Sequence, residues 1–215
     1  MEILNSNPVL KTLLENTQTL WVDIDGTLSD TIGAALAEIR ERYGDVMDIS
    51  RWKSWDPHQI AELQKLGIAT VEDTIELFYS ILKKGWSQVV APIADSQKGI
   101  EKLQMFWKKL IALSGRMEDS REYTRGWLEE NYPWVFQKIL LTDHDTPRQV
   151  PKYQIAHEQG ISVMIEDNAH YAIDLATHDI PTILLAAPWN VDIDTSSYSG
   201  IHRVKDWKEI LTYLG

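Results

Sequence analysis

The stretch from Thr19 to Thr27, TLWVDIDGT, constrains the fold of this chain more than any other. It is a short apolar run closed by a glycine and a hydroxyl residue, which is typical of a buried strand followed by a turn. Because strand side chains alternate between two faces, Asp23 and Asp25 are expected on the same face, opposite Val22. Two buried carboxylates repel each other and lose solvation, and a divalent cation such as Mg²⁺ would compensate for both effects. The alternative is a pair of solvated acids in a polar loop.

Strand and helix patterns alternate from residue 92 onward. Such alternation predicts an α/β fold with a parallel sheet covered by helices on both faces. The expected strands are 110–113, 138–142, 161–165 and 181–185, and the expected helices are 96–109, 119–131, 152–159 and 169–178. Right-handed crossovers make the sheet doubly wound, and ligands then bind beyond the carboxyl ends of its strands.

The segment from residue 30 to residue 92 lacks this alternation and contains helical patterns instead. We therefore expect a core formed by residues 1–29 and 93–215, with a small helical insert at 30–92. From Asp45 onward the insert carries the aromatic residues Trp52, Trp55, Phe78, Tyr79 and Trp86. These side chains can form a core for the insert or an apolar wall beside a ring-bearing substrate.

Two further polar clusters follow expected strands, namely Ser114-Gly115-Arg116 and Glu166-Asp167. Because the carboxyl ends of parallel strands share one edge of a sheet, both clusters are expected beside the aspartates of the first strand. The hydroxyl of Ser114 and the backbone amides after it can bind an anion. Lys152 opens the helix before the Glu166-Asp167 strand, so it can hold an anionic group at the same edge.

In order and spacing, Asp23-Ile24-Asp25-Gly26-Thr27, Ser114, Lys152 and Glu166-Asp167 resemble the four signature motifs of the haloacid dehalogenase superfamily. The resemblance implies a Rossmann-like core with a cap between the first and second motifs. The second aspartate of the first motif is similar to the phosphatase members rather than the dehalogenases. The helical insert, the motifs around Ser114 and Glu166, and Pro188-Trp189-Asn190 look most like the 5′(3′)-deoxyribonucleotidases.

This resemblance implies a Mg²⁺-dependent phosphomonoester hydrolase that acts through an aspartyl phosphate. Asp23 would attack phosphorus, and Asp25 would act as general acid toward the leaving alcohol and then as general base for water. The metal would be held by the Asp23 carboxylate, the Asp25 carbonyl and Asp167. Glu166 would be a further or water-mediated metal ligand.

The remaining candidate residues would bind the substrate. The phosphate-binding residues implied by the motifs are Thr27, Ser114, Gly115 and Lys152, which would neutralise the phosphoryl oxygens. Aromatic faces stack on nucleobases, so Trp52 and Trp55 are the expected base contacts, with Arg116 as a further substrate-binding residue. A nucleoside monophosphate is therefore the expected substrate.

Charge and composition limit the partners. The chain has 215 residues, no cysteine and a formal net charge of −11. This charge opposes binding to long nucleic acids and anionic membranes, whereas a small phosphate needs only a local cation and backbone donors. The first residues lack a basic region and an apolar segment, so a cytoplasmic protein is expected. A homodimer is compatible with the sequence.

Three alternatives remain open from the sequence. A polynucleotide 3′-phosphatase also resembles the motif around Ser114, although the insert and the negative charge oppose the approach of a duplex end. A sugar-phosphate phosphatase or phosphomutase shares the nucleophile and the position of the cap. The third alternative, a non-catalytic phosphate-binding protein, is opposed by the intact set of motif residues. Two other acidic stretches, 143–145 and 191–195, are interpreted as loops outside the catalytic set.

Overall fold

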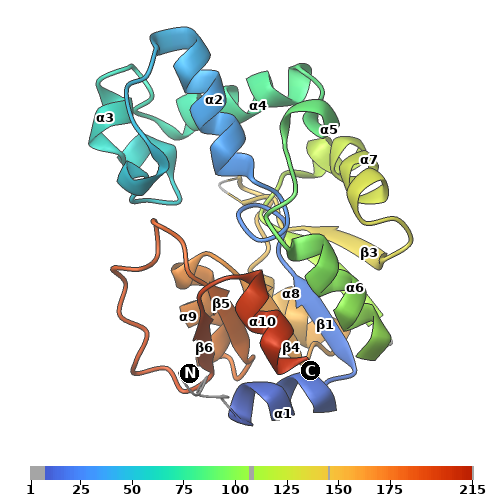
Figure 1. Ribbon diagram of the computed structural model, residues 1–215. Coiled ribbons are helices and arrows are strands. Elements are labelled where there is room, and N and C mark those ends of the chain that lie inside the picture. Colours follow the sequence, from blue (N-terminus) through green and yellow to red (C-terminus); the bar gives the residue numbers. More distant parts are fainter. Residues whose placement is uncertain (1–7, 107–108, 145, 215) are drawn as a thin grey trace.

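Six parallel strands form the sheet in the computed structural model, which describes residues 8–106, 109–144 and 146–214 (Figure 1). The strands are β1 (Thr19–Val22), β2 (Lys109–Ser114), β3 (Phe136–Leu141), β4 (Val163–Glu166), β5 (Thr182–Leu185) and β6 (Ile201–Val204). Their order across the sheet is β3-β2-β1-β4-β5-β6, and all neighbours are parallel. This doubly wound arrangement confirms the predicted α/β fold class.

The first strand lies at the centre of the sheet because it is apolar on both faces. Trp21 and Val22 are both fully buried, and they belong to different core clusters. Val22 pairs with Ala112 of β2 on one side and with Ile165 of β4 on the other. The backbone N–H of Asp23 also donates to the Ile165 carbonyl (3.0 Å). The chain that follows β1 therefore begins between the ends of β2 and β4.

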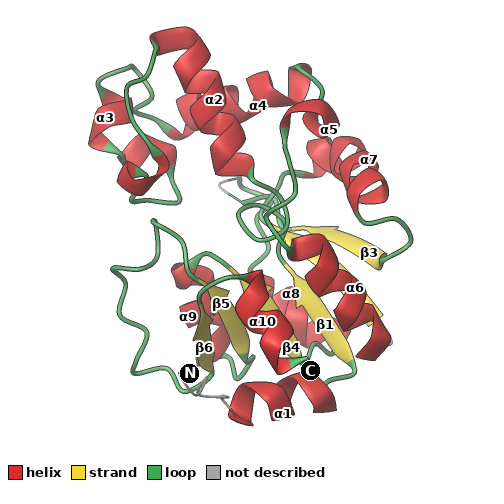
Figure 2. Cartoon of the chain, in the orientation of Figure 1, coloured by secondary structure: helices red, strands yellow, loops and turns green. Residues whose placement is uncertain are grey.

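Helices cover both faces of the sheet (Figure 2). The apolar cluster that contains Val22 includes residues of α1 (Pro8–Asn16), α6 (Ser96–Phe106), α7 (Arg121–Asn131) and α10 (Trp207–Tyr213). The cluster that contains Trp21 includes residues of α8 (Lys152–Gln159) and α9 (Ala169–Thr177). The sheet is thus buried between two helical layers, as expected when crossovers alternate between its faces.

Residues 30–92, between β1 and α6, form helices that lie together above the sheet in the view of Figure 1. They are α2 (Thr31–Tyr43), α3 (Ala61–Gln64), α4 (Val71–Lys83) and α5 (Trp86–Val89), with 3₁₀ turns at Ile49–Arg51 and Pro57–Gln59. Side chains cap the two longest helices: Asp30 accepts the N–H of Gly33, and Thr70 and Asp73 form a capping box. Residues 30–92, all of them described, contain no strand.

The two ends of this helical segment lie side by side. Ser29 and Pro92 form an isolated antiparallel bridge, and the N–H of Asp30 donates to the carbonyl of Ala91 (2.8 Å). The segment therefore leaves and rejoins the chain of the sheet at one place, directly after β1.

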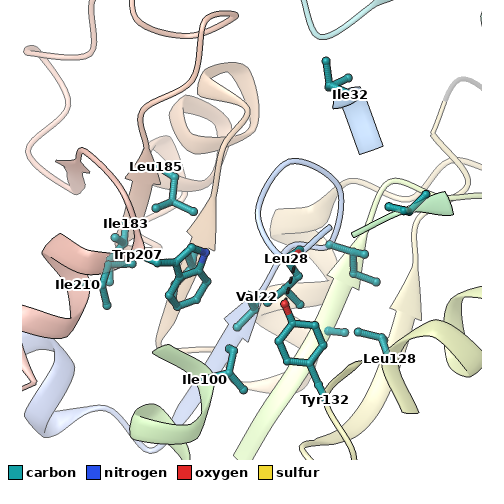
Figure 3. Packing of buried hydrophobic residues seen from close by; sticks show 14 of the residues in the cluster. Val22, Leu28, Ile32, Ile100, Leu128, Tyr132, Ile183, Leu185, Trp207 and Ile210 are labelled. Carbon is teal, nitrogen blue, oxygen red and sulfur yellow. Dashed lines mark hydrogen bonds between the residues drawn. The ribbon is translucent and has the colours of Figure 1, made fainter. Parts of the chain in front are cut away.

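Aromatic side chains hold the loop that follows β1. The hydroxyl of Tyr132 donates to the Leu28 carbonyl (3.1 Å), and the indole N–H of Trp207 donates to the Thr27 carbonyl (2.8 Å). Figure 3 shows Tyr132 and Trp207 within the apolar cluster beside this loop. Gly99 of α6 permits the close approach of α10, because a Cβ there would lie 2.3 Å from the Trp207 ring. These buried hydrogen bonds fix the loop that carries the first motif.

Two elements, β6 and α10, are not predicted by the apolar patterns of the sequence. β6 reads Ile-His-Arg-Val and is an edge strand, so it is only partly buried and lacks a continuous apolar run. None of the helices in the described part of the chain is both long enough and apolar enough to cross a membrane.

Candidate active site

Three strand ends form the floor of a cavity beneath the inserted helices. Its polar lining includes Asp23 and Asp25 after β1, Ser114 at the end of β2, Glu166 at the end of β4 and Lys152 at the start of α8. These residues meet because β1 lies between β2 and β4 in the sheet. The structure therefore brings together the groups that the strand-end rule places at this edge.

Asp23 is a buried carboxylate on this floor, with only 4% of its surface exposed. Its Oδ1 accepts a hydrogen bond from the Nζ of Lys152 (2.6 Å). Burial and the nearby carboxylate of Glu166 raise the pKa of Asp23 well above its ordinary value, against the opposing charge of Lys152. The lysine thus favours the ionised carboxylate, the form in which Asp23 can act as a nucleophile.

Lys152 is a fixed positive charge inside the site. It is the first residue of α8, it is fully buried, and its Nζ also donates to the Oε2 of Glu166 (2.7 Å). The Nζ lies 4.3 Å from the centre of the Tyr171 ring. Burial alone would lower the pKa of Lys152, but Asp23 and Glu166 raise it instead. The sequence marked this lysine by its place at a helix start and by the motif resemblance, and the structure places its Nζ between two carboxylates.

Asp23, Glu166 and Asp167 form a buried acidic cluster in which one oxygen of each lies within 4.8 Å of the others. Burial raises the pKa of Asp167 as well, and the charges of Glu166 and Asp23 increase the shift. The one positive charge of Lys152 does not balance the negative charges of these three carboxylates. Since all donors are oxygens and a divalent cation would neutralise that charge, the residues fit Mg²⁺.

Both carboxylate oxygens of Glu166 have protein partners. Oε1 accepts the backbone N–H groups of Asp167 (3.2 Å) and Asn168 (3.0 Å), and Oε2 accepts the ammonium of Lys152. Glu166 therefore anchors Lys152 in addition to belonging to the acidic cluster.

Thr27 does not occupy its predicted place. A phosphate contact is expected from the motif, but the fully buried hydroxyl donates to Oδ1 of Asp167 (3.0 Å). The preceding Gly26 has a φ of +77°, and a Cβ there would lie 2.2 Å from Oδ2 of Asp167, so glycine is required at this turn. The indole N–H of Trp189 donates to that Oδ2 (2.8 Å). Thr27 and Trp189 thus orient Asp167, as outer-shell partners orient the ligands of a metal.

Asp25 is held by a bidentate ion pair with Arg116. Nε of Arg116 donates to Oδ2 (2.8 Å) and Nη2 donates to Oδ1 (2.7 Å). The hydroxyls of Thr31 (2.6 Å) and Ser114 (3.1 Å) donate to the same carboxylate. Burial alone would raise the pKa of Asp25, but Arg116 and these hydroxyls hold it below its ordinary value. The orientation of this carboxylate is therefore fixed from several sides.

Arg116, which the sequence predicts to bind substrate, is instead largely bound to other protein groups. It lines the cavity, but its guanidinium is directed to Asp25 and, through Nη1, to the hydroxyl of Thr124 (2.9 Å). The physical reason is the sheet order, because Arg116 follows β2 and Asp25 follows the adjacent β1. The hydroxyl of Ser114 likewise donates a hydrogen bond to the Asp25 carboxylate, and Gly115 lines the cavity.

The inserted segment supplies the apolar wall of the cavity, formed by Trp55, Ile75, Phe78, Tyr79, Leu82 and Trp86. Trp52 requires a correction, because it is fully buried in the core and does not line the cavity. A direct contact with a nucleobase is therefore not retained for Trp52. Trp55 and Phe78 are partly exposed at the cavity and have free surface for such a contact.

The cavity also contains Tyr171, which the sequence did not mark, and His144, and the centres of these two rings lie 5.6 Å apart in an edge-to-face contact. His144 belongs to the stretch 143–145, which the sequence places at a strand end and outside the catalytic set; it follows β3, the neighbour of β2, and therefore reaches the same edge of the sheet. The adjacent Asp145 lies outside the described residues. Residues 191–195 form turns and loop as predicted, and they do not line the cavity.

A family model described as 5′ nucleotidase, deoxy (Pyrimidine), cytosolic type C protein matches residues 17–214. No curated protein matches the chain significantly.

Solved structures share the fold. They include a haloacid dehalogenase-like family hydrolase of Streptococcus pneumoniae (TM-score 0.65, 14% identity, 93% of this chain and 99% of that chain covered). A predicted phosphatase of Clostridium acetobutylicum has a TM-score of 0.63 at 15% identity, with 91% and 99% covered. A predicted phosphoglycolate phosphatase of Haemophilus somnus has a TM-score of 0.61 at 14% identity, with 93% and 98% covered. At such low identity these likenesses concern the fold alone.

Proposed function

The chain belongs to the 5′ nucleotidase, deoxy (Pyrimidine), cytosolic type C family and is a phosphatase with the haloacid dehalogenase fold, and we propose that it hydrolyses nucleoside monophosphates through an aspartyl phosphate on Asp23. The observation that carries the proposal is the position of Asp23. It lies at the end of β1, beside the buried charge of Lys152, and it faces a cavity whose opposite wall is aromatic. A phosphate on the floor would thus place an attached nucleobase against that wall.

In the first step of the proposed reaction, a carboxylate oxygen of Asp23 attacks phosphorus. The bond between phosphorus and the ester oxygen breaks, and its electron pair stays on the leaving oxygen. A proton from the carboxyl group of Asp25 neutralises that oxygen and releases the alcohol. Because Arg116 favours the anion of Asp25, Asp25 would first take up this proton from the monoprotonated phosphate of the substrate, whose second pKa is about 6.

In the second step, a water molecule attacks the phosphorus of the aspartyl phosphate. The bond between phosphorus and the Asp23 oxygen breaks, which restores the carboxylate and releases inorganic phosphate. Asp25 accepts the proton from the attacking water. Lys152 remains charged throughout and stabilises negative charge on Asp23 and on the transferring group.

We propose Mg²⁺ as the cofactor, held by the Asp23 carboxylate, the backbone carbonyl of Asp25 and Asp167. When bound, the metal supplies a Lewis acid that neutralises charge on the phosphoryl oxygens. The buried acidic cluster and the hydrogen bonds from Thr27 and Trp189 to Asp167 support this assignment.

Replacement of Trp189 tests the metal site from its outer shell. Trp189→Phe removes the N–H that orients Asp167 and keeps most of the aromatic volume. We expect the Mg²⁺ concentration for half-maximal activity to rise about 10- to 100-fold. The measurements are activity against Mg²⁺ concentration and Mg²⁺ binding by calorimetry. Trp134→Phe, at a 99% exposed tryptophan, is the control. An unchanged requirement for Mg²⁺ in Trp189→Phe would contradict the role of this side chain.

We propose that residues 30–92 act as a cap that selects the substrate. The floor recognises a phosphate, and the helices of this segment cover it with aromatic side chains. One base stacked on an aromatic side chain contributes roughly 1–3 kcal/mol. A hexose phosphate would need polar partners that this wall offers only sparsely, so nucleotides are the favoured class.

The experiment is a panel of phosphomonoesters assayed with Mg²⁺. It contains deoxynucleoside and ribonucleoside monophosphates, glucose 6-phosphate, phosphoglycolate and p-nitrophenyl phosphate. We expect the highest kcat/KM for a nucleoside monophosphate. A preference for a sugar phosphate or for phosphoglycolate would overturn the nucleotide assignment and leave the phosphatase activity standing.

Truncation of the aromatic wall should separate nucleotides from small esters. For Phe78→Ala we expect kcat/KM for the best nucleotide to fall about ten- to a hundredfold, because a stacking surface is lost. The value for p-nitrophenyl phosphate should change little. Glu76→Ala, at an exposed residue of the same helix α4, is the matched control. An equal loss on both substrates would show that Phe78 only packs the cap.

A further inference from the structure

Trp86 and Arg116 connect the inserted helices to the acid-base carboxylate, and we propose that Trp86 is a positioning residue for Asp25. The indole ring holds the guanidinium of Arg116, and the guanidinium holds the Asp25 carboxylate in the orientation for proton transfer. This inference rests on the proposed function, because it takes Asp25 as the general acid and base. It extends that function by giving the cap a part in the chemistry as well as in substrate selection.

The guanidinium of Arg116 is bound by the protein through all three of its nitrogen atoms. Nε and Nη2 donate to the two oxygens of Asp25, and Nη1 donates to the hydroxyl of Thr124. The side chain of Arg116 is only 9% exposed, so water competes little for these bonds. Because the fork is bidentate, a rotation of the guanidinium would turn the carboxylate with it or break a buried charge pair.

Trp86 covers one face of this guanidinium. The Cζ of Arg116 lies 4.3 Å from the centre of the indole ring, which is the arrangement of a cation–π contact. Trp86 is the first residue of α5, at the end of the inserted segment, and only 4% of its surface is exposed. The contact therefore joins the cap to the floor of the site.

A second element supports the same guanidinium. Thr124 belongs to α7, and α7 lies beside α5 (Figure 1). The indole N–H of Trp127, also in α7, donates to the carbonyl of Val90 directly after α5 (2.8 Å). Arg116 is thus enclosed by Asp25, Thr124 and Trp86, and two of these three partners belong to elements that pack on each other.

A positioning role differs measurably from a role as substrate wall. A wall residue affects substrates according to their size and shape. A residue that positions the general acid affects them according to how much the leaving group needs a proton, because a good leaving group departs as an anion unaided. Two aryl phosphates of nearly equal shape, phenyl phosphate and p-nitrophenyl phosphate, therefore separate the two roles.

The experiment compares kcat/KM for these two esters in wild type, Trp86→Leu, Trp86→Phe and Thr124→Val. In Trp86→Leu we expect the value for phenyl phosphate to fall about tenfold further than the value for p-nitrophenyl phosphate. Trp86→Phe keeps an aromatic face over Arg116 and should restore most of the wild-type ratio. Trp134→Leu, at the 99% exposed tryptophan, should leave both values unchanged.

Thr124→Val provides a second test of the same inference that remains valid if Trp86→Leu fails to fold. It removes the acceptor for Nη1, preserves the shape of the side chain, and lies outside the cavity lining. We expect the ratio to shift in the same direction as in Trp86→Leu, by a smaller factor. An unchanged ratio in Thr124→Val, with both esters equally slowed in Trp86→Leu, would overturn the inference. If wild type hydrolyses neither ester, the proposed function itself has failed, which is a different result.

Discussion

Asp23→Asn is expected to reduce turnover of every phosphomonoester to less than about a hundredth of the wild-type value. The amide keeps the size of the side chain and can still accept a hydrogen bond from Lys152, but it lacks the anionic oxygen that attacks phosphorus. The measurement is kcat for the best nucleotide together with acid-quenched mass spectrometry of the protein. Wild type should show a transient phosphoryl adduct on Asp23, and the variant should show none.

The chain contains its own control for this substitution. Residues 191–194 read Val-Asp-Ile-Asp, as residues 22–25 do, but Asp192 is an exposed loop residue that forms an ion pair with Lys53. Asp192→Asn should leave turnover unchanged. Retention of more than about a hundredth of the activity in Asp23→Asn would mean that another group is the nucleophile.

The same variant should not lose stability. Burial raises the pKa of Asp23, so its ionised carboxylate costs folding free energy at neutral pH in the metal-free protein. We therefore expect the Tm of metal-free Asp23→Asn to equal or exceed that of wild type. A large fall in Tm would show that the loss of activity reflects unfolding.

Removal of the metal is expected to abolish activity, and added Mg²⁺ should restore it. Asp167→Asn keeps the shape of the side chain and removes one of the charges of the acidic cluster. We expect its turnover to fall about a thousandfold at Mg²⁺ concentrations that saturate wild type, because the lost Lewis-acid contribution amounts to several kcal/mol. Full turnover in a thoroughly chelated sample would contradict the metal requirement.

Thermal unfolding tests Mg²⁺ binding without a measurement of enzyme activity. A cation that binds only the folded protein raises its stability by mass action. Mg²⁺ should therefore raise the Tm of wild type, and the increase should be absent or much smaller in Asp167→Asn. Glu158→Gln, at an exposed acid of α8, should keep the wild-type response to Mg²⁺.

The polar ends of the strands were predictable because their signal is local. An apolar run closed by acids, or by Ser-Gly, marks a strand end whatever the rest of the chain does. The order of a parallel sheet then brings these ends to one edge. β6 gave no such signal, because an edge strand is partly solvated and its residues need not be apolar.

The roles of individual side chains near these ends were less predictable. The motif assigns Thr27 to phosphate, but its hydroxyl donates to Asp167, a residue 140 positions away in the chain. Trp52 and Trp86 belong to the same aromatic set in sequence. Only packing distinguishes them, since Trp52 is enclosed in the core and Trp86 lies against Arg116 at the cavity.

By itself the sequence determined the α/β class, the helical insert, the three groups of polar residues at strand ends and the lysine at a helix start, because these signals depend on near neighbours along the chain. The tertiary structure alone decided which charges pair: Lys152 between Asp23 and Glu166, and Arg116 on Asp25. Two of these pairs join residues far apart in the chain, 129 positions for Lys152 and Asp23 and 91 for Arg116 and Asp25, whereas Lys152 and Glu166 are 14 positions apart. The geometry of these ion pairs follows from the order of β2, β1 and β4 in the sheet and from the burial of each charged group. Neither the strand order nor the burial can be predicted from a local sequence pattern.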